Sequence, residues 1–377
     1  MEFYIDNSEL SLGLARVQGI VDKTGTSILS HVLLHAEDDK LSITATDSNM
    51  SLMSIYGARI EQAGSICVKA HRFFQVVKSL EDKTVHVKLK TGNRLDVKSG
   101  KAKFRIAECQ SADEYPPIGK LEVNSSIEIA SGDLKRLIDE TVFSIIDNDR
   151  AGLNGAHLES HELESKKSVL RMVTTDGNRL SFSESEFKGE LDSSIKQFFG
   201  KMLLPRKSLL ELRKFCELPD EQWTVGFGHK QAEFSKSDLD LQVALVDGQF
   251  PEYQPVLDSL NPKSEATVTQ KSLGSVFKRV SIFTSKSNNS VTFDFGESGL
   301  ILSTSNPDFG DFKEEIDADY VGDPIRIAFN IRYFQDILAA VDGDQLRLEF
   351  GSDLDPCVVR IPGRDDCKFI VMPMRLN

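Results

Sequence analysis

The sequence repeats one pattern of helices and strands three times, with a period of about 130 residues. In each third, a short amphipathic helix is followed about thirty residues later by a strand that ends in a small polar turn, and then by a second helix. The first helices are expected at 10–17, 134–138 and 273–280, the strands at 41–47, 170–176 and 300–306, and the second helices at 71–77, 206–212 and 332–338. A period this long exceeds the units of solenoids and propellers, so it predicts three tandem domains of one fold.

Polar segments that contain proline mark the ends of the thirds. Residues 115–120 close the first third, and residues 250–253 with 260–264 close the second. A chain of 377 residues gives each third about 125 residues, which is enough to bury a hydrophobic core. We predict domains at 1–122, 123–260 and 261–377.

Most of the remaining sequence alternates in the manner of strands. Residues 84–89 turn at 91–93 and return as 94–98, and a second turn leads into 101–106. The same meander recurs around 223–227 with 239–243, and around 346–350 with 358–361. Each third therefore contains two copies of a helix followed by antiparallel strands, which predicts the α+β class with six such half-units.

Charge is divided unevenly along the chain. The net charge of −13 argues against a protein that holds nucleic acid over its whole surface. The six predicted helical segments together carry about +7, which leaves about −20 for all other residues. Helices also favour Lys and Arg by propensity, so charge alone leaves two interpretations open, a set of helices that faces a polyanion and an ordinary set of solvated helices.

No motif for catalysis, metal binding or a cofactor is found. His31 with His35, and His157 with His161, have the spacing of a helical zinc pair, but both pairs lie in strand-like segments, where i and i+4 are about 13 Å apart. The turn at 174–178 lacks the glycine-rich cradle and lysine of a phosphate loop, and the run 147–149 lacks the glutamate that ends a calcium loop. The sequence therefore predicts no catalytic residue, no metal and no cofactor.

The remaining features predict a cytoplasmic protein. The five cysteines are odd in number and include no C-x-x-C pair, which favours reduced thiols. Met1–Asp6 is acidic and alternates like a strand, so we expect no signal peptide. No apolar run approaches the roughly 20 residues of a membrane helix, so no membrane contact is expected.

The run Val371-Met372-Pro373-Met374-Arg375-Leu376 resembles the C-terminus of the bacterial sliding clamps, the beta subunits of DNA polymerase III. Four further motifs match that family in order and spacing: Leu153-Asn154-Gly155, Thr175-Asp176-Gly177-x-Arg179-Leu180, Val246-Asp247-Gly248-x-Phe250-Pro251-x-Tyr253 and Phe329-Asn330-x-x-Tyr333. Each motif alone is weak. Five together, on a threefold repeat of the right length, make the resemblance specific and extend it over the whole chain.

The resemblance implies three clamp domains and a head-to-tail homodimer that closes as a ring around duplex DNA. It implies a non-catalytic processivity subunit of a DNA-directed DNA polymerase, which acts in DNA replication in the bacterial cytoplasm, at the nucleoid. Helices would line the hole, and their cations would face phosphates without reading bases. The candidate DNA-facing residues are Lys23, Arg16, Arg72, Lys78, Lys135, Arg136, Arg206, Lys207, Arg213, Lys214, Lys278 and Arg279.

Ring closure by a head-to-tail contact requires two different, complementary surfaces. The first third supplies a basic edge with apolar neighbours, at Lys98, Lys101, Lys103, Phe104 and Ile106. The last third supplies acidic and apolar residues, at Ile282, Phe283, Asp308, Asp311, Glu314 and Glu315. We expect these two sets to form the dimer interface. The alternative is that Phe104 and Phe283 are ordinary core residues.

The resemblance also implies a pocket for short peptides of DNA polymerase subunits, the clamp loader and other partners. The matching positions are Leu153, Thr175, Gly177, Arg179, Leu180, Pro251, Val256, Asn330, Tyr333, Met372, Pro373, Met374 and Arg375. Apolar walls would accept a Leu or Phe anchor, and polar groups would fix the peptide backbone. Asn178, Pro255, Pro356 and Asn288 depart from the family's usual residues, a His, an Arg, a small polar residue and an aromatic one.

Two alternatives remain. A clamp-like binding module that never encircles DNA predicts a stable monomer. An enzyme with Asp176 as a metal ligand in the 174–179 turn predicts a metal-dependent activity that Asp176→Ala abolishes.

Overall fold

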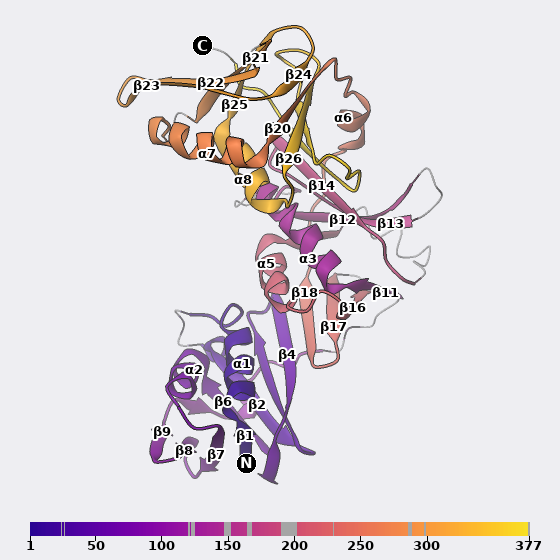
Figure 1. Ribbon diagram of the computed structural model, residues 1–377. Coiled ribbons are helices and arrows are strands. Elements are labelled where there is room, and N and C mark those ends of the chain that lie inside the picture. The colour runs from indigo at the N-terminus through magenta and orange to yellow at the C-terminus, as the bar shows by residue number, and fades with distance from the viewer. Residues whose placement is uncertain are drawn as a thin grey trace. The chain divides into compact units, whose positions relative to one another are not determined.

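The computed structural model describes residues 1–23, 25, 27–119, 121, 125–146, 152–163, 168–189, 202–228, 230–285, 289–297 and 299–375. They form two compact units (Figure 1). Unit 1 comprises Met1–Ser131, Lys188–Ile195 and Lys214–Leu245, and unit 2 comprises Gly132–Phe187, Lys196–Arg213 and Val246–Asn377. Unit 1 therefore contains the first third of the sequence and part of the middle third, and unit 2 contains the rest.

The repeating structural element is a strand, a helix and three antiparallel strands. The first third contains it twice: β1 (Glu2–Asp6), α1 (Asn7–Val17), β2 (His31–Glu37), β3 (Lys40–Thr46) and β4 (Met50–Gly57), then β6 (Gly64–Lys69), α2 (Ala70–Lys78), β7 (Thr84–Lys90), β8 (Arg94–Ser99) and β9 (Ala102–Ile106). The last third has β20 (Ser264–Thr269), α7 (Gln270–Val280), β21 (Ser290–Gly296), β22 (Gly299–Asn306) and β23 (Gly310–Ile316), then β25 (Ile325–Asn330), α8 (Ile331–Ala340), β26 (Gln345–Phe350), β27 (Cys357–Arg360) and β28 (Cys367–Val371).

The middle third follows the same order. Its elements are β11 (Ser125–Ala130), α3 (Ser131–Asp139), β12 (Gly155–Glu162), β13 (Ser168–Thr175) and β14 (Arg179–Ser185), then β15 (Met202–Pro205), α5 (Arg206–Phe215), β16 (Gln222–Phe227), β17 (Gln231–Lys236) and β18 (Leu239–Ala244). Short additions are β5 (Arg59–Gln62), β10 (Cys109–Gln110), β19 (Val246–Asp247), β24 (Asp319–Val321), α6 (Gln254–Asp258) and the 3-10 turns η1 (Ile28–Ser30), η2 (Ala112–Glu114), η3 (Val142–Ser144) and η4 (Ser281–Phe283).

The two half-units of each third exchange their first strands. β1 pairs with β7 and β6 with β2, β11 pairs with β16 and β15 with β12, and β20 pairs with β26 and β25 with β21. Each meander therefore obtains its fourth strand from the other half-unit. This exchange links the two half-units of each third.

Two pairings join the sheets of neighbouring thirds. In unit 1, β4 pairs with β18 within a nine-stranded sheet of order β10-β6-β2-β3-β4-β18-β17-β16-β11, and a five-stranded sheet has the order β5-β1-β7-β8-β9. In unit 2, β14 pairs with β28 within a ten-stranded sheet of order β19-β15-β12-β13-β14-β28-β27-β26-β20-β24, and a four-stranded sheet has the order β23-β22-β21-β25. Among these strands, β9 and β23 each stand at a sheet edge.

The core of the last third shows how sequence positions the helices. Figure 1 shows α7 and α8 next to each other in unit 2, and Phe277 of α7 packs against Phe334 of α8 with ring centroids 6.3 Å apart. Thr269 caps α7 and Asn330 caps α8, because each side chain accepts a hydrogen bond from a backbone amide in the first turn. Both phenylalanines are buried, and each contributes about 2–3 kcal/mol of transfer free energy.

The sequence predictions of class and helices are confirmed. Six predicted helices correspond to α1, α2, α3, α5, α7 and α8, whereas the five-residue helix α6 was not predicted. The histidine pairs lie on strands β2 and β12, as expected, and all five cysteines are free thiols. None of the helices formed by the described residues has the length and apolar character that crossing a membrane requires. The predicted domain limits stay a prediction.

Candidate functional site

An apolar cluster in unit 2 joins the middle and last thirds of the sequence. Strands β13 and β14 contribute Val173, Leu180 and Phe182, and β28 contributes Ile370. Its other buried members are Leu203, Phe250 and Tyr253, and Val246, Leu257 and Leu260 pack against it while partly exposed. The cluster exists because β14 pairs with β28, with Leu180 directly opposite Ile370.

Three predicted peptide contacts lie next to this cluster in sequence and space. Val256, which is exposed, belongs to α6 and precedes Leu257, which packs on the cluster. Pro251 follows cluster member Phe250 and is exposed. Leu153 is half-buried beside Gly152, where an added Cβ would collide with the Gln249 carbonyl oxygen. Residues 152–153 therefore lie against the segment that leads into Phe250.

The turn between β13 and β14 is held by its own side chains. One oxygen of Asp176 accepts hydrogen bonds from the amides of Asn178, at 2.9 Å, and Arg179, at 3.0 Å. Thr175 donates to the carbonyl of Arg179 at 2.6 Å and accepts from the amide of Gly177 at 3.1 Å. Gly177 has a φ of 90°, which favours glycine. Asp176 is thus a turn-forming residue, which argues against its role as a metal ligand.

Arg179 connects this turn to α8. Its guanidinium donates to Asp176 at 3.0 Å and to Asp336 at 2.6 Å. It also lies over the ring of Tyr333, 4.5 Å from the centroid, and over Phe143 at 5.3 Å. Burial raises the pKa of the Tyr333 hydroxyl, and the charge of Asp176 adds to that rise. The arrangement fixes a half-buried cation beside the apolar cluster.

The C-terminal segment completes the wall. Met372 donates its amide to the Asn178 carbonyl at 2.9 Å, and Met374 donates to the Ala328 carbonyl at 2.7 Å. These bonds hold the two methionine side chains at 41% and 39% exposure, next to Pro373 and Arg375. The structure therefore brings Thr175, Gly177, Arg179, Leu180, Asn330, Tyr333 and Met372–Arg375 together. Exposed methionines beside an apolar cluster suit the binding of an apolar anchor.

A buried ionic network behind the cluster escaped the sequence reasoning. Arg171 donates to Glu184 and, at 3.1 Å, to the hydroxyl of Tyr253, which in turn donates to Glu159. His157 contacts Glu159 at 3.2 Å and stacks on Phe250 at 5.1 Å. In the structure β13 is buried on both faces, because all but its first residue are buried. Such a strand requires a layer on its outer face.

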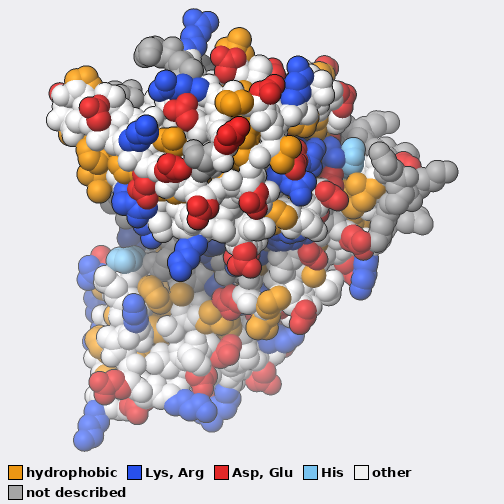
Figure 2. All heavy atoms as spheres, turned by 45° about the horizontal axis from the view of Figure 1, so that its top comes forward, with side chains coloured by type: hydrophobic (Ala, Val, Ile, Leu, Met, Phe, Trp, Pro, Cys, Tyr) orange, Lys and Arg blue, Asp and Glu red, His pale blue; other side chains and the backbone are white. Residues whose placement is uncertain are grey.

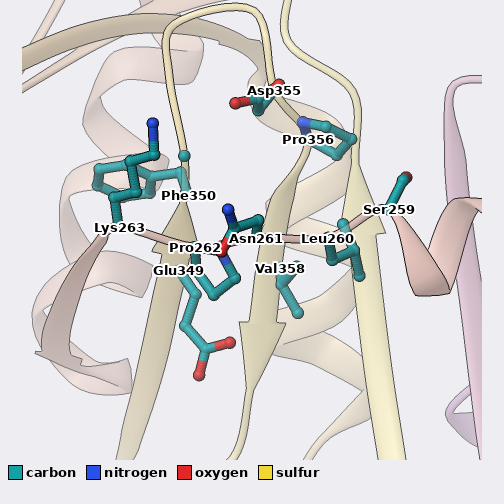
Figure 3. Close-up of a pocket in the computed structure, with 11 residues that line it drawn as sticks. Ser259, Leu260, Asn261, Pro262, Lys263, Glu349, Phe350, Asp355, Pro356 and Val358 are labelled. Carbon is teal, nitrogen blue, oxygen red and sulfur yellow. The ribbon is translucent and has the colours of Figure 1, made fainter.

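A cavity of about 320 Å³ adjoins the cluster through Leu260 (Figure 3). Figure 3 shows its side chains coming from the segment 259–263, from β26 and from the loop and strand that contain Asp355, Pro356 and Val358. Pro356, one of the positions that depart from the family's usual residues, therefore lines a hollow. Asn288, another such position, lies outside the described residues.

The predicted DNA-facing residues differ in what they contact. Lys23, Lys78 and Lys278 are exposed, whereas Lys135 and Arg206 are half-buried. Besides Arg16 and Arg136, cations of this set that form ion pairs include Arg72 with Glu108 at 3.0 Å, Lys135 with Asp139 at 3.7 Å, Arg213 with Asp139, and Arg279 with Glu314. Lys207 and Lys214 are exposed, and both make further interactions. Figure 2 shows cationic and anionic side chains mixed over the face in view.

The structure does not support a DNA-facing role for Arg16 or Arg136. Arg16 is only 8% exposed, and its guanidinium donates to Asp238 at 2.9 Å and to the Tyr56 hydroxyl at 3.1 Å. Arg136 donates to Asp366 at 2.7 Å and to the Glu184 carbonyl at 2.9 Å. Both arginines connect the sheets of neighbouring thirds, because Asp238 and Asp366 each precede the strand that makes the pairing.

The predicted dimer residues mostly lie on open sheet edges. Lys98, Lys101, Lys103 and Phe104 are exposed on or beside β9, but Ile106 is 4% exposed and packs inside its own domain, so it is removed from the set. Asp308, Asp311 and Glu315 are exposed on or beside β23, and Glu314 pairs with Arg279. Ile282 is 70% exposed on η4, and Phe283 packs on Phe312 at 5.8 Å.

Comparison with known proteins gives a consistent result over the whole chain. Family models described as the N-terminal, central and C-terminal domains of the DNA polymerase III beta subunit match residues 1–119, 128–252 and 260–375. A beta sliding clamp of Vibrio cholerae is 30% identical over 379 residues, with both chains fully covered. The chain belongs to the DNA polymerase III beta subunit family. It acts in DNA replication as a sliding clamp, a non-catalytic subunit of the polymerase holoenzyme.

Solved clamp structures share this fold. A beta subunit from Thermotoga maritima is 26% identical with a TM-score of 0.89, and both chains are fully covered. A sliding clamp from Bartonella birtlesii bound to griselimycin is 27% identical with a TM-score of 0.91, again over both whole chains. A further relative by sequence, a beta sliding clamp of Haemophilus influenzae, is 29% identical over 382 residues, with full coverage of both chains.

Proposed function

We propose that two copies of this chain close head to tail into a ring around duplex DNA, and that the cluster beside Arg179 docks short peptides of replication and repair proteins. The ring follows from the edge strands. The last strand of a first meander pairs with the last strand of a second meander twice, in β4 with β18 and in β14 with β28. β23 is likewise the last strand of a first meander, and β9 is the last strand of a second meander. By the same rule β23 would pair with β9 of another copy, and both strands stand at sheet edges.

The internal pairings also define the register of the proposed contact. Leu52 lies opposite Leu241, and Ser181 lies opposite Phe369. In the hairpins β3–β4, β13–β14 and β22–β23, equivalent positions are held by the cross-strand pairs Ala45–Leu52, Thr174–Ser181 and Thr304–Phe312. Phe312 is therefore the counterpart of Leu52 and Ser181. In the hairpins β17–β18 and β8–β9, equivalent positions are held by the cross-strand pairs Lys236–Leu239 and Ser99–Ala102. Phe104, two residues after Ala102, is therefore the counterpart of Leu241, two residues after Leu239. The register then sets Phe312 opposite Phe104, and Asp311 opposite Arg105, of the second copy.

This register combines apolar and ionic contacts. Phe104 is 37% exposed at the edge and Phe312 is half-buried under Phe283, so their contact would remove apolar surface from water. Lys101 is the counterpart of Asp238, which pairs with Arg16 in the last turn of α1, so Lys101 would come near the last turn of α7, where Arg279 pairs with Glu314. Phe104, Ile282 and Phe283 therefore act as interface residues in this proposal, not as ordinary core residues.

The helices would face the DNA in the ring. After removal of Arg16 and Arg136, the proposed contacts are Lys23, Arg72, Lys78, Lys135, Arg206, Lys207, Arg213, Lys214, Lys278 and Arg279. Several of these cations are already paired with carboxylates, so each phosphate contact would exchange one ion pair for another. Weak contacts of this kind suit a protein that is held by topology and slides. The clamp would then work at the nucleoid during replication.

Retention on DNA tests the ring directly. The protein is loaded onto nicked circular DNA by a clamp loader, and the DNA is then cut once. A ring slides off the new ends, so bound protein falls to the level seen with linear DNA. Protein that stays bound after cutting would show a groove binder, the clamp-like module that never encircles DNA.

A further inference from the structure

The outer face of the four-stranded sheet in unit 2 forms an open trough of about 590 Å³. Its floor is made of small hydroxyl side chains, at Ser290 and Thr292 of β21 and at Ser303 and Ser305 of β22. Because these side chains are small, the floor leaves room for an incoming peptide chain, and their hydroxyls supply hydrogen-bonding groups along its path.

The rim of the trough is basic. Lys313 stands on β23, Arg326 stands on β25, and Arg375 comes from the C-terminal segment, while Asp311 is the one acidic lining residue. Arg326 pairs with Asp294 at 3.3 Å and still keeps 62% of its side chain exposed. In the proposed register Asp311 lies opposite Arg105 of the second copy, so ring closure would offset its charge. A net positive rim is unusual on a chain whose net charge is −13.

The trough is continuous with the candidate peptide site. Met374 pairs with Ala328, so the segment that exposes Met372 and Met374 runs along β25 and ends with Arg375 in the trough. Asn330, a predicted peptide contact, lies directly opposite the floor residue Ser290. A bound peptide that continues past the methionines in an extended form, at about 3.3 Å per residue, would enter the trough within a few residues.

We propose that this trough binds an acidic flank of partner peptides, next to their apolar anchor. The inference rests on the proposed peptide site and adds a second recognition element to it. Carboxylates of the flank would face Lys313, Arg326 and Arg375, and its backbone would face the hydroxyl floor. Partners with the same apolar anchor would then be ranked by the charge of their flanks, which gives specificity more than affinity.

A peptide fits the trough better than nucleic acid does. The trough lies on the outer face of the sheet, opposite the face where Phe293 and Phe329 pack on α8, whereas DNA in the ring would face the helices. Its three cations are spaced around the hydroxyl residues and not along a continuous basic stripe. Single-stranded nucleic acid would also require stacking partners, and the lining contains a single aromatic residue, Phe312.

The test compares fluorescent peptides that share one Leu- and Phe-anchored core and differ in four flanking residues, either Asp and Glu or Asn and Gln, placed on one end or the other. Fluorescence anisotropy is measured with the full chain at low and high salt. We expect the acidic flank on one end to tighten binding roughly threefold to tenfold at low salt, and salt to remove most of this gain. Lys313→Gln with Arg326→Gln should abolish the gain and leave the neutral peptide unaffected.

A charge-matched control is Lys40→Gln with Lys90→Gln, two exposed lysines of unit 1, which should keep the gain. Equal affinity of the acidic and neutral peptides would overturn the inference while leaving the peptide site intact. Failure of both peptides to bind would instead contradict the proposed peptide site. An oligonucleotide that removes the gain at lower concentration than a free acidic tetrapeptide would assign the trough to nucleic acid.

Discussion

The guanidinium of Arg179 donates a hydrogen bond of 2.6 Å to the carboxylate of Asp336, and this bond links the β13–β14 turn to α8. The same guanidinium lies 4.5 Å from the centroid of the Tyr333 ring. Arg179 and Tyr333 come from different thirds of the sequence, and both are candidate peptide contacts. The ion pair therefore sets the distance between two walls of the site before any partner arrives.

Loss of this link should weaken peptide binding without removing either contact residue. Asp336→Asn keeps the shape of the side chain but removes the charge that holds Arg179, so we expect a roughly threefold to tenfold rise in peptide Kd. Isothermal titration calorimetry measures this Kd. Asp342→Asn, an exposed aspartate shortly after α8, is the control. An unchanged Kd for Asp336→Asn would mean that the ion pair does not position the site.

The two exposed methionines should supply much of the apolar contact. Met372→Ala with Met374→Ala removes side chains that are 41% and 39% exposed, so stability should change little while peptide binding is lost. Met53→Ala removes a methionine of 37% exposure in unit 1 and should leave binding unchanged. Light scattering should show the same oligomeric state for all three proteins. Retained affinity in the double variant would relocate the peptide site.

The repeat made much of the architecture predictable from the sequence. Helices such as 273–280 were found because apolar residues recur at helical spacing, and α7 spans Gln270–Val280. The turn at Thr175-Asp176-Gly177 was predictable because its chemistry is local, as the hydrogen bonds of Asp176 show, whereas the peptide site there was implied only by the family resemblance. The short helix α6 was missed because its five residues are too few for a periodic signal.

Contacts between distant residues could not be predicted in this way. Arg16 and Arg136 have the helical position and charge of DNA-facing residues, and only the pairings of β18 with β4 and of β28 with β14 bring Asp238 and Asp366 to them. Ile106 ends an exposed edge strand yet is buried, because strand alternation turns it toward Leu95. The Arg171–Tyr253 contact likewise joins residues 82 positions apart. Composition and spacing carry no information on such pairings.

Acid should weaken the junction at Asp366. Burial alone would raise the pKa of this carboxyl, but the hydrogen bond from Arg364 and the charges of Arg136 and Arg364 hold the pKa below its usual range. A lowered folded-state pKa gives a contribution that is complete above the unfolded pKa of about 3.9 and is lost as pH falls through the folded value. Since Asp366 is more than a third exposed, the contribution is about 1 kcal/mol or less.

The free energies of urea unfolding of the chain and of Asp366→Asn should therefore differ at pH 7, and the difference should be smaller at about pH 3. Asp365→Asn, the exposed neighbour, should match the unsubstituted chain at both values. A difference between the chain and Asp366→Asn that is as large at about pH 3 as at pH 7 would show that the side chain stabilises the junction by shape and not by charge.

The ring makes the strictest prediction, because it specifies both surfaces and their register. Ile282→Asp with Phe283→Asp sets charges on the apolar part of the edge, so light scattering should show monomers, and a persisting dimer would exclude this interface.

Arg105→Cys with Asp311→Cys sets two thiols opposite each other in the proposed register, within the Cα separation of up to about 6.8 Å that a disulfide allows. Mild oxidation should then give covalent dimers. Arg105→Cys with Lys313→Cys sets the thiols on a diagonal of about 7–8 Å and should cross-link far more slowly. Faster cross-linking of the diagonal pair would mean that β23 and β9 meet in a register shifted by two residues.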